Sequence, residues 1–257
     1  MSAPSLRTEN LTIRFGGHAA VNGVTAAFRP GELTVIVGPN GAGKTTWFNL
    51  VSGQLAPTEG RVFKGEVDIT RLSPSARAKI GIGRAFQLTN LFPRLSVLEN
   101  IRLAVQARHG AGPSLFRRVS AFRDIAREAE AHLDSARLSA AAHLPAAALP
   151  HGDQRKLEVA LLIAMQPDIF MFDEPTAGMS ADEAPVILDL IAGIKKDTSK
   201  TILLVEHKMD VVRALADRIL VLHNGELVAE GDPSTVMAMP IVREIYLGVS
   251  DDGREAA

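Results

Sequence analysis

Residues Gly38–Thr46 read GPNGAGKTT, and this stretch decides the fold. It fits the phosphate-binding pattern G-x-x-x-x-G-K-[ST]. The run ELTVIVG before it is rich in β-formers and stops at glycine, as a buried central strand does. The run TTWFNLVSG that overlaps its end is typical of a helix that ends at Gly53. Because a strand before the loop and a helix after it are the context this motif requires, we predict a phosphate-binding loop here.

The residue types in this loop indicate how it would hold a triphosphate. Glycines allow backbone N–H groups to wrap phosphates without clashes from Cβ atoms. Lys44 can reach the β- and γ-phosphates, and the Thr45 hydroxyl can ligate Mg²⁺. Trp47, the only tryptophan, follows directly and is expected to pack its helix against the sheet. The predicted phosphate-binding residues are Gly38, Asn40, Gly41, Ala42, Gly43, Lys44, Thr45 and Thr46.

A second segment, IFMFDE, supplies acidic groups for the same site. Its four apolar residues indicate a core strand, and Asp173 at the strand end can hold the Mg²⁺ shell. Glu174 follows at once and is placed to orient or deprotonate an attacking water. An acidic pair at a strand end is otherwise a helix cap or a solvated loop, but the phosphate loop upstream favours the catalytic interpretation.

Strand and helix patterns alternate around these segments, which implies a mostly parallel sheet and an α/β, P-loop NTPase core. At the N-terminus, LTIRF and VTAAF predict two strands of an antiparallel β subdomain, joined by the turn-rich link GGHAAVNG. RILVLHNGELVAEG predicts a hairpin that turns at Asn224–Gly225. PIVREIYLG predicts a last short helix.

The middle of the chain has a different character, rich in Arg and Ala and helical in pattern. Ser96 and Glu99 have the spacing of a capping box, which begins a helix there. Since strand patterns resume afterwards, we expect an inserted α-helical subdomain at about 88–160. We expect a single nucleotide-binding domain over 1–250, with a frayed tail at 251–257.

Composition excludes several classes of protein. The formal net charge of −1 argues against a nucleic-acid partner, because phosphate contacts need a basic surface. The absence of cysteine excludes disulfides and cysteine-ligated metals. The N-terminus lacks the features of a secretory signal, and no apolar run approaches the roughly 18 residues that span a bilayer. A role at a membrane would therefore depend on a partner.

Five segments occur in one order: the phosphate loop, the AFQ glutamine, the glycine turn before RKLEVA, FDEPTAG and VEH. This series resembles the nucleotide-binding subunit of an ATP-binding cassette (ABC) transporter, and the resemblance covers the chain from about Leu6 to Gly248. RFGGHAAVNGV, HGDQRKLE, DEPTAGM and IVREIYLG resemble the ATPases of branched-chain amino acid importers, in particular the first of their two ATPase subunits. Urea and short-chain amide importers share these features.

The resemblance implies roles for matching residues, with ATP and Mg²⁺ as cofactors. Phe15 matches the aromatic residue that stacks on adenine, although a plain strand-core role is the alternative. Gln87 matches the glutamine that senses Mg²⁺ and water and links the core to the helical insert. His207 matches the histidine that contacts the γ-phosphate and positions Glu174. Ser180 stands where an aspartate is more common, in the loop that crosses the dimer.

The stretch LPHGDQ departs from the family signature Leu-Ser-Gly-Gly-Gln. Pro150 replaces the serine and offers no N–H, which leaves Gly152, the following amides and the helix dipole. Gly152 and Asp153 would face the ATP bound on a second subunit. Asp153 brings a negative charge there unless its side chain caps its own helix, which we expect.

The resemblance also implies partners and a location. The subunit would lie on the cytoplasmic face of the inner (plasma) membrane, as a peripheral partner of integral-membrane permease subunits. A second ATPase subunit, a paralogue or a second copy, would complete an ATP sandwich, and the branched-chain resemblance favours two different ATPases. A solute-binding protein would select the substrate. Leu91 and Phe92 would either dock a permease helix or be buried under the helical insert.

Two other functions remain open at this point. One is a different ABC ATPase of the lipopolysaccharide-extraction type, which the HGDQ turn and the YLG ending disfavour. The other is a soluble ATP-binding regulatory protein, which the full set of catalytic residues disfavours. The expected function is therefore an ATPase that powers import of a small solute through separate membrane subunits.

Overall fold

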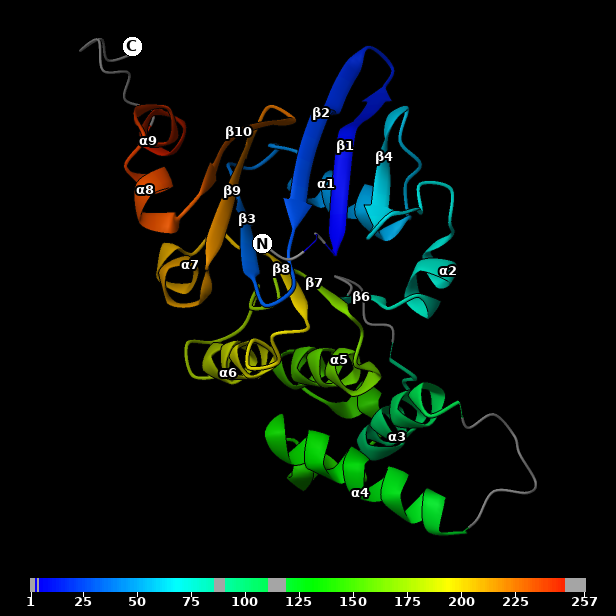
Figure 1. Ribbon diagram of the computed structural model, residues 1–257. Helices are drawn as coiled ribbons and strands as arrows, with labels where there is room; N and C mark the ends of the chain where they lie inside the picture. Colours follow the sequence, from blue (N-terminus) through cyan, green and yellow to red (C-terminus); the bar gives the residue numbers. More distant parts are fainter. Residues whose placement is uncertain (1–2, 4, 86–90, 111–118, 248–257) are drawn as a thin grey trace. The chain divides into compact units, whose positions relative to one another are not determined.

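The computed structural model describes residue 3 and residues 5–85, 91–110 and 119–247 (Figure 1). The chain divides into two compact units: residues 1–82, 168–174 and 197–257 form the first, and residues 83–167 and 175–196 form the second. The domain limits predicted from the sequence stay a prediction, and the tail at 251–257 lies outside the described residues.

The main sheet has six strands in the order β10-β9-β3-β8-β7-β6. Strands β7, β8, β3 and β9 run parallel, and β10 pairs antiparallel with β9. Strands β3, β8 and β7 are buried at every residue, which explains their nearly unbroken apolar sequences. The strand bounds are Leu33–Val37 for β3, Ile82–Ala85 for β6, Ile169–Asp173 for β7, Thr201–Val205 for β8, Arg218–His223 for β9 and Glu226–Gly231 for β10. The predicted parallel sheet and the Asn224–Gly225 hairpin are both confirmed.

A second, antiparallel sheet of the first unit has the order β2-β1-β4-β5. Its strands are β1 (Leu6–Phe15), β2 (His18–Phe28), β4 (Glu59–Lys64) and β5 (Val67–Asp68). The predicted antiparallel subdomain is confirmed, but the expectation that all of GGHAAVNG forms a turn-rich link is wrong. The turn is only two residues long, and His18–Gly23 already belongs to β2. The pairing of Ile13 with Val21 holds this glycine-containing segment in the sheet, and register shifts in β1 accommodate it.

Helix α1 (Lys44–Ser52) follows the phosphate loop and ends at Gly53, as predicted. One hydrophobic core contains its apolar face together with buried residues of both sheets. Trp47 is 1% exposed, and its ring centroid lies 5.5 Å from that of Phe28 in β2. The predicted packing of Trp47 against a sheet is confirmed, and the ring partner comes from the antiparallel sheet.

The end of α1 is held by a buried arginine from helix α2 (Pro74–Lys79). Arg77 is 1% exposed, and its guanidinium donates to the carbonyl oxygens of Leu50, Val51, Thr70 and Leu72. Burial lowers the pKa of Arg77 to about 10. Leu50 and Val51 belong to the last turn of α1, where carbonyl groups lack the i+4 N–H partners of the helix interior, and Arg77 supplies donors to both.

We predict that Arg77→Ala lowers the free energy of unfolding by about 3 kcal/mol, because it leaves buried carbonyl groups without their donor. Urea unfolding followed by circular dichroism would measure the change. Arg71→Ala is the matched control: this arginine is exposed and its loss should change stability by no more than about 0.5 kcal/mol. Equal stability of the two variants would contradict the structural role of Arg77.

The remaining helices of the first unit are α7 (Met209–Leu215), α8 (Pro233–Met237) and α9 (Pro240–Leu247). Both α8 and α9 contact β10, and Figure 1 shows them beside that strand. The predicted last helix is confirmed as α9. Its Tyr246 side chain is largely buried, and burial raises the pKa of that hydroxyl to about 12.

The second unit is helical and has its own core. It contains α3 (Val97–Arg108), α4 (Val119–Ser135), α5 (His151–Met165) and α6 (Ala184–Ile194), with short 3₁₀ turns at Ser139–Ala141 and Ala146–Ala148. Helix α3 packs on α4 and α5, and α5 packs on α6. The Ser96 hydroxyl accepts the backbone N–H of Glu99, so the predicted helix start is confirmed. Within the described residues, no helix has the length and hydropathy to span a membrane.

Candidate functional site

The phosphate loop lies between β3 and α1 and approaches other backbone segments closely. A Cβ atom on Gly43 would lie 2.4 Å from the Ala20 carbonyl oxygen, and one on Gly38 would lie 2.2 Å from that of Leu222. Gly43 also has a positive φ of 95°. Both positions therefore require glycine. The loop leaves backbone N–H groups at the start of a helix, which is the arrangement that binds phosphate.

The side chain of Lys44 is held inside this loop. It is 8% exposed, and its Nζ donates to the carbonyl oxygens of Gly38 at 2.7 Å and Pro39 at 3.0 Å. Burial lowers the pKa of Lys44, while the negative charges of Glu174 and Asp173 oppose that shift. The ammonium thus lies near both carboxylates, where a phosphate could replace the loop carbonyls as its partner.

Asp173 and Glu174 lie at the carboxyl end of β7, beside the end of β8. Asp173 is 2% exposed, and the backbone N–H of Glu174 donates to Val205 at 3.1 Å. Glu174 has a positive φ of 48°, in the left-handed region that costs a non-glycine residue of the order of 1 kcal/mol. The strand end therefore turns sharply and turns Glu174 out of the core, with its side chain 30% exposed.

His207 follows β8 and lies beside Glu174. Its Nδ1 is 4.0 Å from Glu174 Oε1 and 3.7 Å from Glu206 Oε2. The structure therefore brings together four of the predicted residues in the first unit: Lys44, Asp173, Glu174 and His207. Gln87, the predicted glutamine, lies outside the described residues.

Phe15 ends β1 and is 54% exposed. The alternative in which it is a strand-core residue is wrong, because its side chain is not part of the hydrophobic core. An exposed aromatic face remains available for stacking.

The residues at the loop and strand end fit a magnesium nucleotide. Thr45 and Asp173 offer hydroxyl and carboxylate oxygens, the ligands that Mg²⁺ prefers. Among the residues that the structure describes, no group of three or more His, Cys, Asp or Glu side chains is arranged so that it could hold a metal ion by itself. Such an ion would thus take other ligands from phosphate oxygens and water, as Mg²⁺ does in nucleotide sites.

The second unit carries the glycine turn at the start of α5. This helix begins at His151 without a side-chain cap, so the expected cap by Asp153 is wrong. Asp153 is the third residue of the helix, where a capping side chain would reach back to the backbone N–H of Pro150, and proline has none. Instead, Asp153 Oδ1 accepts a hydrogen bond from Lys156 Nζ at 2.8 Å.

A carboxylate from the segment before α6 lies against this turn. A Cβ on Gly152 would lie 2.2 Å from Glu183 Oε1. Glu183 in turn accepts hydrogen bonds from the Ser180 N–H at 3.2 Å and the Ser180 hydroxyl at 2.9 Å, which hold its pKa below the usual range. Ser180 thus forms a local turn with Glu183.

Two acidic residues near these segments were missed by the sequence analysis. Glu183 has the S-x-x-E spacing with Ser180, which could have indicated a capping box. Glu206 directly follows the apolar run TILLV, and an acidic residue at the end of a buried strand could have been noted. It is 1% exposed.

Known proteins match the chain over most of its length. The family model described as ABC transporter matches residues 21–177. The high-affinity branched-chain amino acid transport ATP-binding protein LivG of Salmonella typhimurium is 38% identical over 254 residues, covering 96% of this chain and 99% of that protein. BraF of Pseudomonas aeruginosa, which carries the same description, is 38% identical over 255 residues, with the same coverage.

Solved structures agree with these matches. The ADP conformation of an ATP-binding cassette of an ABC transporter superposes with a TM-score of 0.80 at 29% identity, and covers 96% of this chain and 100% of that chain. A dimeric post-hydrolysis cassette bound to ADP and phosphate has a TM-score of 0.75 at 27% identity, covering 89% and 98%. The glycine-rich phosphate loop, the acidic residues at the end of β7 and these matches lead to one conclusion. The chain belongs to the ABC transporter family, as an ATP-binding cassette whose ATPase activity is coupled to transport.

Proposed function

We propose that this ATPase powers the import of branched-chain or other hydrophobic amino acids through separate membrane subunits. The observation that carries the proposal is the 38% identity, over 96% of the chain, to branched-chain amino acid transport ATP-binding proteins. The chain would act as a peripheral subunit on the cytoplasmic face of the inner membrane, with a solute-binding protein upstream. A urea or short-chain amide importer is the second candidate, because the HGDQ and YLG segments fit both.

In the first unit, the chain's own residues would bind ATP and prepare water for attack. Lys44 and the backbone amides of the loop would hold the phosphates, and Phe15 would stack on adenine. Thr45 and Asp173 would hold Mg²⁺, which neutralises charge on the phosphates when it is bound. Glu174 would accept the proton of the attacking water. His207 would position Glu174 and contact the γ-phosphate.

We infer that hydrolysis requires a second ATPase subunit. One solved relative is described as a dimeric cassette bound to ADP and phosphate, which supports such an assembly. In the dimer, Gly152 and the start of α5 would face the ATP of the partner. The positive end of this fifteen-residue helix favours an anion there, and Pro150 contributes neither a hydroxyl nor an N–H.

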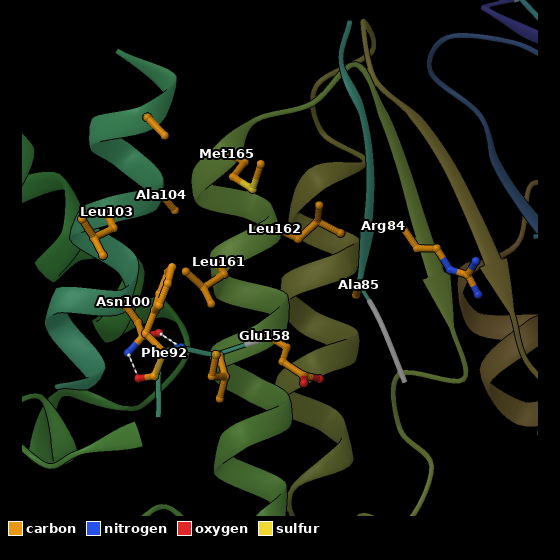
Figure 2. Close-up of a pocket in the computed structure, with 12 residues that line it drawn as sticks. Arg84, Ala85, Phe92, Asn100, Leu103, Ala104, Glu158, Leu161, Leu162 and Met165 are labelled. Carbon is orange, nitrogen blue, oxygen red and sulfur yellow. Dashed lines mark hydrogen bonds between the residues drawn. The ribbon is translucent and has the colours of Figure 1, made fainter. Parts of the chain in front are cut away.

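We propose that a permease helix docks in a groove of the second unit (Figure 2). It has a volume of about 380 Å³ and lies between α3 and α5, with mostly apolar side chains. Both Leu91 and Phe92 line it; Phe92 is 56% exposed, whereas Leu91 is partly buried and also packs against the helical core. Of the two predicted roles, exposure supports docking for Phe92, and packing supports burial for Leu91.

The position of Phe92 in this groove is fixed by Asn100, which is 1% exposed. Asn100 accepts the backbone N–H of Phe92 at 2.8 Å and donates to its carbonyl oxygen at 3.1 Å, as the dashed lines in Figure 2 mark. Glu158 adds one carboxylate to the lining, paired with Arg155 at 3.0 Å. An exposed aromatic ring on a hydrogen-bonded backbone beside an apolar groove is a typical anchor for a partner helix.

We predict that Phe92→Asp weakens binding of the membrane subunits about 30-fold, because it places a charge in an apolar contact. Co-purification of tagged permease subunits would measure the loss. Leu144→Asp is the matched control, since Leu144 is an exposed leucine of the same unit that does not line the groove. The docking role is wrong if Phe92→Asp assembles and transports like the unchanged protein.

The proposed function as a whole can be tested in one preparation. The chain, expressed with its two candidate permease subunits, should co-purify with them and show ATPase activity that a substrate-loaded binding protein stimulates. Leucine and urea would be compared as substrates. Stimulation by urea alone would favour the second candidate. A chain that hydrolyses ATP but binds no membrane subunit would overturn the transport role and favour a soluble regulatory one.

A further inference from the structure

Glu206 is a buried carboxylate to which the reaction outlined above gives no part. It lies between β8 and α7 and is 1% exposed. Its Oε2 accepts the backbone N–H of His207 at 2.8 Å and that of Lys208 at 3.2 Å. An ionised group in such a place is costly unless hydrogen bonds compensate for the lost water, and charge-assisted bonds to N–H groups do so.

Capping of helix α7 explains only part of this arrangement. The two N–H groups lie just before the start of α7, where the helix dipole favours a negative charge. However, α7 already has Asp210 in its first turn, an exposed acidic residue that serves the dipole without burial. A capping role alone does not require a buried carboxylate next to His207.

The position of the His207 ring supplies the second observation. Its Nδ1 lies 3.7 Å from Glu206 Oε2 and 4.0 Å from Glu174 Oε1, so two carboxylates lie near the same ring nitrogen. Both separations exceed normal hydrogen-bond lengths. The hydrogen bond to the His207 backbone is therefore the short contact through which Glu206 holds this residue.

We propose that Glu206 is a positioning residue for ATP hydrolysis. By holding the backbone at His207 and Lys208, its carboxylate sets the place of the imidazole beside Glu174. Glu206 acts through His207 and touches no substrate. The inference rests on the role proposed above for His207, because a fixed imidazole matters only if that imidazole takes part in hydrolysis.

A double-mutant cycle tests the inference, with kcat and KM for ATP measured in the assembled transporter. Glu206→Ala should lower kcat about 10-fold and leave KM within about twofold, since the phosphate loop is untouched. Glu206→Gln should lose less, because its amide oxygen still accepts an N–H. In a His207→Ala background, Glu206→Ala should cause no further loss of kcat.

Asp210→Asn provides the matched control, because it removes a negative charge from the same helix start without contacting the His207 N–H. It should leave kcat unchanged. Thermal unfolding of each variant, and amide hydrogen exchange at His207 and Lys208, would show whether the fold persists while the local hydrogen bonds are lost. If Glu206→Ala does not fold, the cycle is run with Glu206→Gln.

The outcomes distinguish failure of the role inferred for Glu206 from failure of the role proposed for His207. Suppose that His207→Ala lowers kcat and that adding Glu206→Ala lowers kcat further by the same factor as in the unchanged protein. Glu206 then does not act through His207, and the inference is overturned while the proposed role of His207 stands. An equal loss from Asp210→Asn would overturn it in the same way, in favour of helix capping. If His207→Ala keeps the original kcat, the proposed role of His207 fails, and the inference fails with it.

Discussion

Glu174→Gln should reduce steady-state ATP hydrolysis by about 1000-fold while ATP still binds. The amide has nearly the shape of the carboxylate but cannot accept a proton, and general bases contribute about 10²- to 10⁴-fold to such reactions. The backbone at Glu174 is held at φ 48° by the end of β7 and by the hydrogen bond to Val205. The substitution should therefore remove the proton acceptor without moving the strand end.

Two measurements on one preparation would check this expectation. Phosphate release gives kcat, and the fluorescence of Trp47, the only tryptophan, reports nucleotide binding next to the phosphate loop. Glu66→Gln is the matched control, because that carboxylate is 87% exposed and should leave hydrolysis unchanged. Normal turnover by Glu174→Gln would show that another group acts as the base. A Trp47 signal that ignores saturating Mg-ATP would instead contradict the pocket itself.

The parts of the site that could be predicted from sequence have strong local signals. A glycine-rich loop between an apolar run and a helical pattern can be recognised from its residues and spacing alone, although the backbone that requires glycine at Gly38 and Gly43 comes from distant segments. Likewise, IFMFDE placed Asp173 at the end of a buried strand because apolar residues fill parallel strands. The Asn-Gly turn and the Ser96 cap also depend on a few neighbouring residues.

Long-range interactions decided the points that the sequence did not reveal. His18–Gly23 pairs in a strand because β1 lies next to it, although the residues themselves favour a turn. The four carbonyl acceptors of Arg77 come from two separate segments, the end of α1 and the loop before α2, which no local pattern brings together. Glu183 meets Gly152 from a segment about thirty residues away. In contrast, the error about Asp153 has a local cause. Proline at the cap position has no N–H that could donate to the Asp153 carboxylate.

Gly152→Asp should lower ATP hydrolysis by at least about 100-fold in the assembled transporter and leave binding of ATP by this chain intact. Gly152 belongs to the helical unit, whereas the phosphate loop and the acidic strand end belong to the other unit. The added carboxylate would meet Glu183, whose pKa is held low by hydrogen bonds from Ser180, so two negative charges would adjoin at the helix start. That charge would repel the γ-phosphate of a partner-bound ATP.

The measurement uses the Glu174→Gln background, in which hydrolysis cannot empty the sites. Size-exclusion chromatography with ATP would show whether the ATP-dependent dimer of ATPase subunits forms, and Trp47 fluorescence would show whether each chain still binds nucleotide.

Gly193→Asp is the matched control: the same substitution lies in α6 of the same unit, where a Cβ has no neighbour within 4 Å. Gly152→Ala separates size from charge, because a methyl group can be accommodated by movement of the flexible Glu183 carboxylate. If Gly152→Asp abolished ATP binding by its own chain, the start of α5 would contact the ATP of that chain and not the ATP of the partner, which contradicts the proposal. If the dimer formed normally, the start of α5 would not face the partner's phosphate, since an added negative charge there could not be tolerated beside it.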